Sequence, residues 1–515
     1  MLKISQIKTG LDQPLNKEII ARKLKCREED ILSFTIDRQS LDSRFDEISY
    51  VYSVYAEVKN EVKYLKRKDV LQAEKEDYDL PSTGAEMPRP LIVGFGPAGM
   101  FAGLILAECG YKPLIIERGK AVEERVRDIE LFFREGVLDQ ESNIQYGEGG
   151  AGTFSDGKLT TRIKNVRIQK VLQEFVEAGA EKEILYQAMP HIGTDILRRI
   201  VRNIREKIIR LGGEIRFNTR LEQLIIQNQR IVGVSTSQGI IDCTDVLLCT
   251  GHSARDTYQM LYEQGIEIIQ KDFAAGFRVE HPQYMVDQNQ YGKYAGHPLL
   301  GPASYRLTHT TSNHRGVYSF CMCPGGIVVP SPVIADTLVV NGMSYSDRGG
   351  DNANSAILVQ IPTGDFDHGH PLDGFIFQEQ LERNAYYPGY AAPVQNITDY
   401  MNRQRTSSLV IPSSYPRDTV FTDMHDLFTE VMNLSFHEAF INFDHKIPGF
   451  IQKGIMIGME SRSSSPIRMV RGNDGMCVSC AGLFPCGEGP GYAGGIVSSA
   501  VDGIKQVENL IHRYL

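Results

Sequence analysis

Two short apolar runs, separated by a longer apolar segment, begin near residue 90. They predict a strand, a helix and a second strand in succession. The run Leu91–Val93 has the composition of a buried strand, and Met100–Cys109 has that of a buried helix. A second apolar run, Pro113–Ile116, follows the helix. Strands that alternate with helices are typical of parallel sheets, so we predict a βαβ unit here.

The segment before this unit predicts a separate small domain. Residues 15–25 place apolar side chains on one side of a helix. Ile31–Ile36 and Ile48–Val58 are rich in β-branched or aromatic residues, which favour strands. The polar stretch Asp69–Pro90 contains prolines and predicts a linker. We therefore expect an N-terminal α/β domain of the ferredoxin-like type.

Downstream of the βαβ unit the pattern changes near residue 275. Up to that point it predicts further helices and strands, whereas residues 275–450 are rich in Pro, Gly and Tyr and indicate an inserted domain. Helices are predicted at Val122–Glu135, 166–177, 194–211, Asp373–Asn384 and Pro393–Gln404, a strand meander at Gly213–Gln238, and a buried strand within Asp242–Gly251. We divide the chain into residues 1–85, 86–275, 276–450 and 451–515.

Composition and charge narrow the class of protein. The chain has 515 residues, of which 42% are hydrophobic and 23% charged, as in globular proteins. A formal charge of −9 argues against a dedicated nucleic-acid binder. The first residues lack the apolar core of a signal peptide, and no apolar run approaches the ~20 residues of a membrane span. Nine cysteines without framework spacing favour a reducing compartment, so we expect a cytoplasmic protein.

The turn of the βαβ unit carries the glycine fingerprint of dinucleotide-binding folds. Gly94, Gly96 and Gly99 follow the first strand, and Glu117 ends the second. In such turns the first glycine permits the tight bend, the second leaves room for a pyrophosphate, and the third lets helix and strand pack closely. The helix N-terminus attracts the phosphates, and the acidic residue accepts hydrogen bonds from a ribose. The sequence therefore predicts a dinucleotide site.

Two later segments favour FAD over NAD. The buried strand that ends in Thr250–Gly251 is placed to return to the pyrophosphate crevice. The strand Leu483–Pro485 leads to Gly487–Glu488, where an acidic side chain would reach a ribityl hydroxyl. Gly491–Ile496 then opens a helix whose free N–H groups would face the N1/O2 edge of a flavin. We expect FAD, held noncovalently.

Seven segments resemble the bacterial FAD-dependent dehydrogenases labelled NAD(FAD)-utilising, within the glutathione-reductase-like flavoprotein superfamily. They are Gly94–Gly99, Gly147–Lys158, Thr250–Asp256, Gly276–Pro282, Val317–Gly326, Gly458–Arg468 and Gly482–Ile496, and Asp37–Arg44 resembles the leading domain of that group. The family label names no substrate. A second GxGxxG with a downstream acid is missing from the sequence, so NAD(P)H is expected only as a transient reductant that docks on the flavin.

The resemblance implies a Rossmann-like FAD-binding domain with an inserted α+β substrate domain. Together with the fingerprint it implies a set of residues that contact the cofactor. These are Gly94, Gly96, Pro97, Ala98, Gly99, Glu117, Arg118, Gly149, Gly150, Gly152, Thr153, Lys158, Thr250, Gly251, Gly487, Glu488, Gly494, Gly495 and Ile496.

Four residues are candidates for chemistry at the flavin. Arg278 and His281 are placed to bind an anionic substrate and to deliver a proton. The alternative is a structural ion pair of Arg278 with Glu280 and a hydrogen-bonded hinge histidine. Arg462 and Arg468 are placed to neutralise a carboxylate substrate, or else to join a surface ion-pair network.

The cysteine spacings suggest redox chemistry but do not establish it. Cys477 and Cys480 form a CxxC, and Cys321 and Cys323 form a close pair. A flavin with a CxxC would suggest a disulfide reductase. However, this CxxC runs into a predicted strand and has no NAD domain beside it, so we expect small buried cysteines. Zinc needs four ligands at organised spacings, and the scattered histidines do not supply them, so we expect no metal.

The function predicted from the sequence is that of an FAD-dependent oxidoreductase. It would transfer a hydride between an unidentified small substrate and flavin N5, because the flavin itself performs such transfers. Two alternatives stay open. One is a flavoenzyme that acts on RNA through the leading domain, and the other is a non-catalytic, flavin-binding redox sensor.

Overall fold

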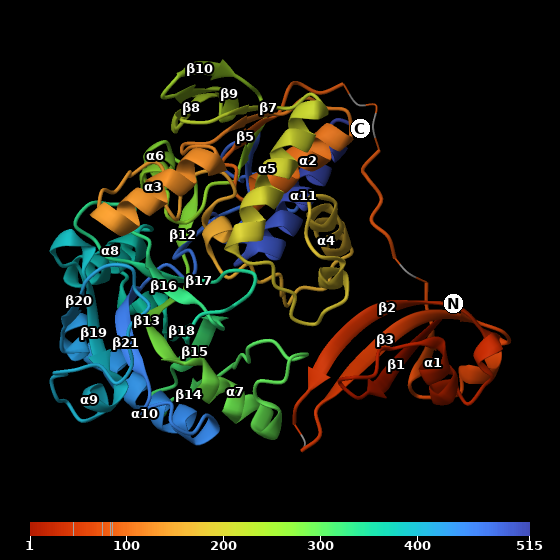
Figure 1. Cartoon of the computed structure of the whole chain (residues 1–515). Coiled ribbons are helices and arrows are strands. Elements are labelled where there is room, and N and C mark those ends of the chain that lie inside the picture. Colours follow the sequence, from red (N-terminus) through yellow and green to blue (C-terminus); the bar gives the residue numbers. More distant parts are fainter. Residues whose placement is uncertain (45, 75, 83, 85) are drawn as a thin grey trace.

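The structure is a computed structural model, which describes residues 1–515 except residues 45, 75, 83 and 85 (Figure 1). A small N-terminal sheet, a parallel sheet covered by helices and a larger mixed sheet follow one another along the chain. The protein is therefore a mixed α/β protein with a parallel sheet, as predicted.

The N-terminal domain is a four-stranded antiparallel sheet with the strand order β2-β3-β1-β4. This is the order of a ferredoxin-like unit in which the short η2 turn (Glu61–Tyr64) replaces the second helix. The predicted boundary at residue 85 lies outside the described residues. The elements are β1 (Leu2–Thr9), α1 (Lys17–Leu24), β2 (Ile31–Asp42), β3 (Ser49–Val58) and β4 (Val70–Gln72).

The N-terminal domain stands beside the rest of the molecule, and the described part of residues 73–90 connects the two (Figure 1). The backbone of Gln39 pairs with a loop of the next domain: its N–H donates to Tyr186 O at 2.7 Å, and its carbonyl accepts from Ala188 N at 2.8 Å. Glu47 accepts hydrogen bonds from Lys293 and Tyr294. Backbone pairing and polar contacts thus attach this domain to the rest.

A five-stranded parallel sheet with the order β23-β11-β5-β6-β7 forms the centre of the second region. The first strand of the fingerprint lies in the middle, and the last strand of the chain returns to the edge beside β11. Parallel strands buried on both faces read as apolar runs, which explains why they were recognisable in the sequence. The strands are β5 (Leu91–Val93), β6 (Leu114–Ile116), β7 (Glu214–Arg216), β11 (Val246–Leu248) and β23 (Leu483–Pro485).

Helices cover this sheet, and α2 packs between the sheet and the helices α5 and α11 (Figure 1). An antiparallel meander and a two-stranded sheet complete the region. The helices are α2 (Pro97–Glu108), α3 (Val122–Glu135), α4 (Arg167–Glu177), α5 (Thr194–Arg210), α6 (Arg255–Glu263) and α11 (Ile496–His512). The strands are β8 (Leu221–Gln227), β9 (Arg230–Thr236), β10 (Gly239–Asp242), β12 (Ile268–Gln270) and β22 (Ile467–Met469). The predicted meander lacks β7, which joins the parallel sheet instead.

The inserted region, called the cap below, is built on a seven-stranded sheet with the order β14-β15-β18-β13-β21-β19-β20. Its strands extend slightly beyond the predicted limits of 276 and 450, because β13 and β21 both belong to it. They are β13 (Phe273–Pro282), β14 (Thr308–Thr310), β15 (Gly316–Cys323), β18 (Asn352–Ile361), β19 (Ala392–Asn396), β20 (Thr419–Phe421) and β21 (Ile455–Glu460). A hairpin of β16 (Ile327–Pro330) and β17 (Val340–Met343) and the helices α7 (Gln283–Tyr291), α8 (Asp373–Asn384), α9 (Ile397–Met401) and α10 (Glu430–Lys446) complete the cap.

One predicted helix in the cap is wrong over its first third. The segment Pro393–Gln404 was expected to be helical, but it begins inside strand β19, and α9 is limited to five residues. Strand β19 pairs with β21, whose residues lie about 60 positions later in the sequence, as in the pair Val394 and Ile457. Pairing at such a distance overrides local spacing.

Within the described residues, no helix combines the length and the apolar character required to cross a membrane.

Candidate functional site

Three glycines with different surroundings lie in the turn that leads from β5 into the first turn of α2. Gly94 has a φ of 98°, and a Cβ atom there would lie 2.7 Å from the carbonyl oxygen of Cys249. A Cβ atom on Gly99 would overlap the carbonyl oxygen of Gly94. Beside Gly96, in contrast, the nearest described atom is the Cα of Gly150 at 3.8 Å. Gly94 and Gly99 are therefore required by the fold, whereas Gly96 leaves space open at the start of α2.

Helices α2 and α11 pack so closely that their backbones approach each other. A Cβ atom on Gly503 of α11 would overlap the carbonyl oxygen of Ala98 in α2, and the two helices run side by side (Figure 1). Helix α2 begins at Pro97 and α11 at Ile496, and each follows a glycine, which has no side chain to cap the helix. Two such helix ends provide backbone N–H groups and positive dipole ends for an anionic ligand.

Glu117 lies at the end of β6 and joins the first glycine loop to the second. Its Oε2 accepts a hydrogen bond from Phe95 N at 2.8 Å, and its Oε1 accepts from Gly119 N at 2.9 Å and Gly147 N at 3.1 Å. A carboxylate accepts about four hydrogen bonds, so capacity for a hydroxyl donor remains. The side chain is 5% exposed. Glu117 is thus both a structural anchor and a candidate ribose acceptor.

Arg118, predicted beside the cofactor, is held in an ion-pair network. Its Nε donates to Glu141 at 2.7 Å, and its Nη1 and Nη2 donate to Asp256 at 3.0 Å. The guanidinium also lies 4.2 Å from the centroid of the Tyr146 ring. Arg118 therefore connects β6 to α6, and any contact with a cofactor would be additional to these.

Arg125 organises the second glycine loop and was missed in the sequence. The fully buried guanidinium donates to backbone carbonyls at the start of this loop and in the turn before it. The acceptors are Asn143 at 2.7 Å, Ile144 at 2.9 Å, Glu148 at 2.7 Å, Gly150 at 3.0 Å and Gly147 at 3.3 Å. Burial lowers the pKa of Arg125 to about 9. The available signal was a charged residue on the same face of α3 as Val122, Ile129 and Phe132, which are buried.

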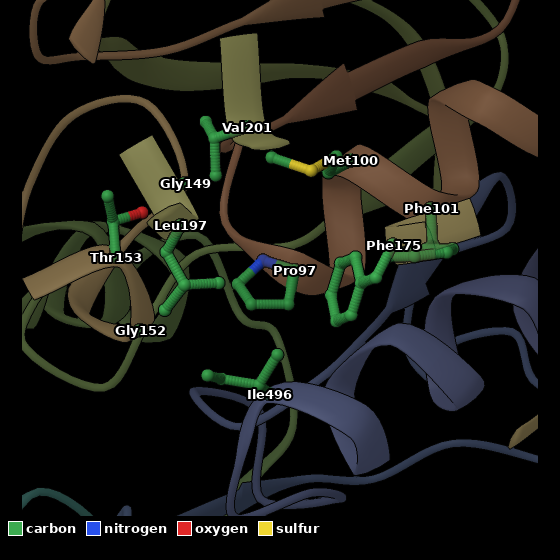
Figure 2. A pocket seen from close by; sticks show the side chains of 10 residues that line it. All are labelled: Pro97, Met100, Phe101, Gly149, Gly152, Thr153, Phe175, Leu197, Val201 and Ile496. Carbon is green, nitrogen blue, oxygen red and sulfur yellow. The ribbon is translucent and has the colours of Figure 1, made fainter. Parts of the chain in front are cut away.

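The second glycine loop, Gly147–Lys158, lies against the first. Gly149 N donates to Phe95 O at 2.8 Å, and a Cβ atom on Gly152 would lie 2.9 Å from Cγ1 of Ile496. A small cleft, partly open to solvent, lies between the two loops and the start of α11. Figure 2 shows its lining: Pro97, Met100, Phe101, Gly149, Gly152, Thr153, Phe175, Leu197, Val201 and Ile496. The loops and the helix start that were predicted to hold FAD thus border one cleft.

Thr153 is one of the residues that line this cleft, and its buried hydroxyl has no described hydrogen-bond partner. The residue is 1% exposed, and its Oγ1 has no hydrogen-bond partner among the described residues. Buried hydroxyls are normally hydrogen-bonded, and an exception calls for an explanation such as a ligand. The neighbouring Glu148 is similar, since its Oε1 is buried without a described partner, and burial raises its pKa to about 7.

The strand end at Thr250 and Gly251 faces the closing segment of the chain. Thr250 Oγ1 is hydrogen-bonded to Tyr258 Oη at 3.0 Å, and the structure describes no atom within 4 Å of a Cβ placed on Gly251. His252 Nδ1 lies 3.3 Å from Glu488 Oε1. Strands β11 and β23 are parallel neighbours that end beside each other, and the backbone at Gly251 is open there.

The closing segment combines a fixed turn with an open one. Gly487 has a φ of 85°, and its N–H donates to Asp502 of α11 at 2.8 Å. Farther on, the structure describes no atom within 4 Å of a Cβ on Gly494, and only Ser498 Oγ, at 3.9 Å, near one on Gly495. The backbone directly before α11 is therefore open, as it is before α2.

Arg278 and His281 do not lie at this cleft. Both are fully buried in β13, inside the cap. Arg278 Nη1 donates to Glu460 at 2.5 Å and its Nε to Asn354 at 2.8 Å. His281 Nε2 lies 2.8 Å from Phe450 O, and burial lowers the pKa of this histidine to about 4. With every atom enclosed, neither has a surface for substrate, so their predicted catalytic roles gain no support.

Arg462 and Arg468 have opposite surroundings. Arg462 is buried and shares Glu382 with Arg255; it donates to this carboxylate at 2.9 and 2.7 Å. Burial opposes ionisation of Glu382, but the two arginines lower its pKa to about 2. This cluster holds the cap against α6. Arg468 is exposed on β22, with its guanidinium 5.4 Å from the centroid of the Tyr492 ring, and stays available to a ligand.

Lys158 ends the second glycine loop near the cap. Its Nζ lies 4.0 Å from Asp156, whose carboxylate accepts hydrogen bonds from Ser344 at 2.5 Å and Arg348 at 3.0 Å. Ser344 and Arg348 belong to the cap, so the loop is anchored there. The Lys158 side chain is 29% exposed and lies where the two regions meet.

Comparison with known proteins identifies relatives of the whole chain and of the cap. Residues 272–463 match a family model described as "FAD-dependent protein, C-terminal domain-like". A protein of Clostridium beijerinckii (strain ATCC 51743 / NCIMB 8052), described as uncharacterised, is 43% identical over 528 residues, which is 100% of this chain and 99% of the relative.

Solved structures give weaker likenesses. Glycine oxidase from Bacillus cereus ATCC 14579 is 12% identical, with a TM-score of 0.31, over 82% of this chain and 95% of that one. A geranylgeranyl bacteriochlorophyll reductase-like protein from Thermoplasma acidophilum is 13% identical, with a TM-score of 0.35, over 82% and 78%. Scores this low carry no functional inference.

The residues around the two glycine loops and the closing segment fit FAD. Open backbone beside Gly96, Gly251 and Gly494, two helix N-termini and the unpartnered hydroxyl of Thr153 are what a dinucleotide with a polar flavin edge requires. The cap matches a family model whose description names the same cofactor. The chain belongs to one family with the Clostridium beijerinckii relative.

Proposed function

We propose that this protein is an FAD-dependent oxidoreductase that holds FAD noncovalently along the cleft between its two glycine loops. One observation carries the proposal. The start of α2, the loop Gly147–Lys158 and the start of α11 border one cleft, and open backbone lies before both helices. Helix N-termini of this kind favour a diphosphate.

In this proposal each part of FAD has its own residues. Glu117 accepts hydrogen bonds from the adenosine ribose, and the pyrophosphate lies over Gly96 and the first turn of α2. We assign Gly149, Gly150, Gly152, Thr153 and Lys158 to the flavin side, Thr250 and Gly251 to the adenosine half, Gly487 and Glu488 to the ribityl chain, and Gly494, Gly495 and Ile496 to the pyrimidine edge.

When bound, FAD supplies hydride transfer at N5, here to or from an unidentified small substrate. The chain contributes position and electrostatics. The N–H groups at the start of α11 favour negative charge at the pyrimidine edge. Apolar side chains such as Met100, Leu197 and Val201 keep water from this part of the cleft. The exposed Arg468 would attract an anionic substrate, and NAD(P)H would act as a transient reductant.

The first test is the cofactor content of the purified protein. We expect a yellow protein with a flavin absorption spectrum, and release of all the FAD when the protein is denatured, because no covalent bond holds it. A protein that stays colourless after incubation with FAD would contradict the proposal. Stopped-flow mixing of the oxidised holoprotein with NADH or NADPH then identifies the reductant by the rate at which the flavin absorbance bleaches.

A further inference from the structure

A group of charged and polar side chains, called the Asp156 cluster below, lies where the second glycine loop meets the cap. The carboxylate of Asp156 is fully buried and accepts hydrogen bonds from Ser344 Oγ at 2.5 Å and Arg348 Nη2 at 3.0 Å. Lys158 Nζ lies 4.0 Å and His191 Nε2 3.8 Å from the same carboxylate. The cluster therefore brings together two cations, an imidazole and a hydroxyl around one acid.

Hydrogen bonds connect the Asp156 cluster to the cleft. Thr194 is the first residue of α5, and its Oγ1 donates to the carbonyl oxygen of Thr153 at 2.8 Å. Its backbone N–H donates to the carbonyl oxygen of Ser344 at 3.0 Å. Thr153 lines the cleft, as Figure 2 shows. A single residue thus separates the lining of the cleft from the cluster.

The cations of the cluster have donors to spare. Within the part of the chain that the structure describes, the guanidinium of Arg348 makes one hydrogen bond, to Asp156, and its Nε is buried without a partner. Lys158 Nζ makes no hydrogen bond to the same set of residues. Two cations therefore share one carboxylate, although partly buried charge is costly unless it is paired.

The charge states leave the cluster positive near pH 7. Burial opposes ionisation of Asp156, but the charges of Lys158 and Arg348 lower its pKa. Burial, followed by the charge of Arg348, lowers the pKa of His191 to about 4, so the imidazole is neutral. Asp195 also acts on His191, but its carboxylate already accepts two hydrogen bonds from Ser346, outside the cluster. One positive charge remains over that of Asp156.

The backbone at Arg348 is held in an unusual conformation. Its φ is 51°, in the left-handed region that residues other than glycine seldom adopt. Such strained residues concentrate at functional sites, where the surroundings hold them in place. The side chains of Lys158, His191 and Arg348 are all partly exposed, so a solute can reach them.

We propose that Lys158 and Arg348 bind the carboxylate group of a small organic acid, which is the substrate of the flavin. This inference rests on the proposed function and names the substrate class. A carboxylate carries the single negative charge that the cluster lacks, and guanidinium and ammonium groups bind it through charge-assisted hydrogen bonds. Asp156 holds the two cations from the side of the loop. The role that the sequence suggested for Arg278, which is enclosed in the cap, thus passes to this pair.

Calorimetric titration of the FAD-saturated wild type with benzoate and with benzamide tests the recognition of charge. Benzamide has nearly the same shape but no charge. Benzoate should bind at least about 10-fold more tightly, because benzamide cannot pair with the two cations. Acetate, a smaller carboxylate, should compete with benzoate. Equal affinities for benzoate and benzamide, or no binding of either acid, would overturn the proposal.

Substitutions in the cluster test where the acid binds. Lys158→Met and Arg348→Met, each saturated with FAD, should lower the affinity for benzoate by at least about 10-fold. Lys164→Met is the matched control, because Lys164 is an exposed lysine later in the same segment, and it should bind benzoate as the wild type does. An unchanged affinity in both cluster variants would show that the acid binds elsewhere.

A third measurement uses the wild type alone, so it does not depend on whether the variants fold. Bound benzoate should slow the reductive methylation of Lys158 by formaldehyde and leave that of Lys164 unchanged, as measured by mass spectrometry of peptides. Equal rates at Lys158 with and without bound benzoate would contradict the proposal. A protein that contains FAD but binds neither acid refutes this inference alone, whereas a protein without FAD refutes the proposed function.

Discussion

The segments proposed to hold FAD contain packed glycines, called the base below, and open glycines, called the rim below. At the base, a Cβ atom on Gly99 or Gly489 would overlap a backbone carbonyl oxygen. At the rim, Gly96, Gly251 and Gly494 have no described atom closer than 3.8 Å to such a Cβ. The fold itself requires the first kind of glycine, whereas no neighbouring atom of the fold excludes a side chain at the second. Substitutions at the two regions should therefore separate folding from cofactor binding.

The largest effect is expected at the base. Gly99→Val places a side chain against the Gly94 carbonyl group and beside the Ile92 side chain, where a buried backbone carbonyl leaves it no room. Overpacking of this kind should lower the free energy of unfolding by more than about 3 kcal/mol. Urea unfolding of the FAD-free protein, followed by circular dichroism, measures it. An unfolding midpoint equal to that of the wild type would show that the base is not packed as described.

Arg125→Met should be nearly as damaging, because it leaves the loop carbonyls that this guanidinium joins without a donor. We expect a loss of about 3 kcal/mol in the free energy of unfolding. Arg127→Met is the matched control, since Arg127 is exposed on the same helix and its loss should be almost neutral. Equal unfolding midpoints for the two variants would show that Arg125 does not organise the loop.

At the rim, Gly96→Val should leave the fold intact and weaken FAD binding by at least about 100-fold, or about 2.7 kcal/mol. The added side chain meets no crowded atom of the protein but fills the space assigned to the pyrophosphate. FAD content and a fluorescence titration of the apoprotein measure the loss. Gly364→Val, at an exposed glycine with no described atom within 4 Å of its Cβ, is the control. Normal FAD content in the Gly96 variant would show that the pyrophosphate does not lie over Gly96.

The same division explains how much of the molecule the sequence could predict. The parallel-sheet region was predicted closely, down to the bounds of α3, because buried parallel strands and amphipathic helices leave local signals. In the cap the bounds of α8 were predicted, but β19 was taken for helix. Its strand character comes from pairing with a segment about 60 residues away, which no local pattern records.

The candidate site shows a similar limit. The glycines and Glu117 were predictable because backbone geometry dictates their type and spacing. Arg278 and His281 were placed at the flavin from their position after a strand, but β13 is an interior strand between β18 and β21, and all its residues are buried. Whether a polar side chain on a strand faces a cleft or a core depends on the strands and helices that cover it. In this chain those elements come from segments much later in the sequence.

The smallest effect is expected at Glu148, which lies between base and rim. Burial raises its pKa from 4.5 to about 7, so the folded state binds more protons than the unfolded state between these values. The free energy of unfolding should therefore fall as the pH rises through this range, with a slope of at most about 1.4 kcal/mol per pH unit. Glu148→Gln should remove this fall with pH. It also removes the ion pair with Arg205, so the net gain in the free energy of unfolding of the apoprotein should be about 1 kcal/mol at pH 8.

Glu123 is the control for this prediction, because it pairs with the same Arg205 from an exposed position. The hydrogen bond from Arg205 lowers the pKa of Glu123, so its contribution to stability has the opposite sign: it is present above the ordinary carboxyl pKa and is lost as the pH falls. Glu123→Gln should therefore lower the free energy of unfolding slightly at neutral pH. The fall of this free energy with rising pH should stay as in the wild type. If the pH slope of the wild-type unfolding free energy disappears when FAD binds, the unpartnered Oε1 of Glu148 contacts the cofactor. If the slope is the same with and without FAD, Glu148 has a purely structural position.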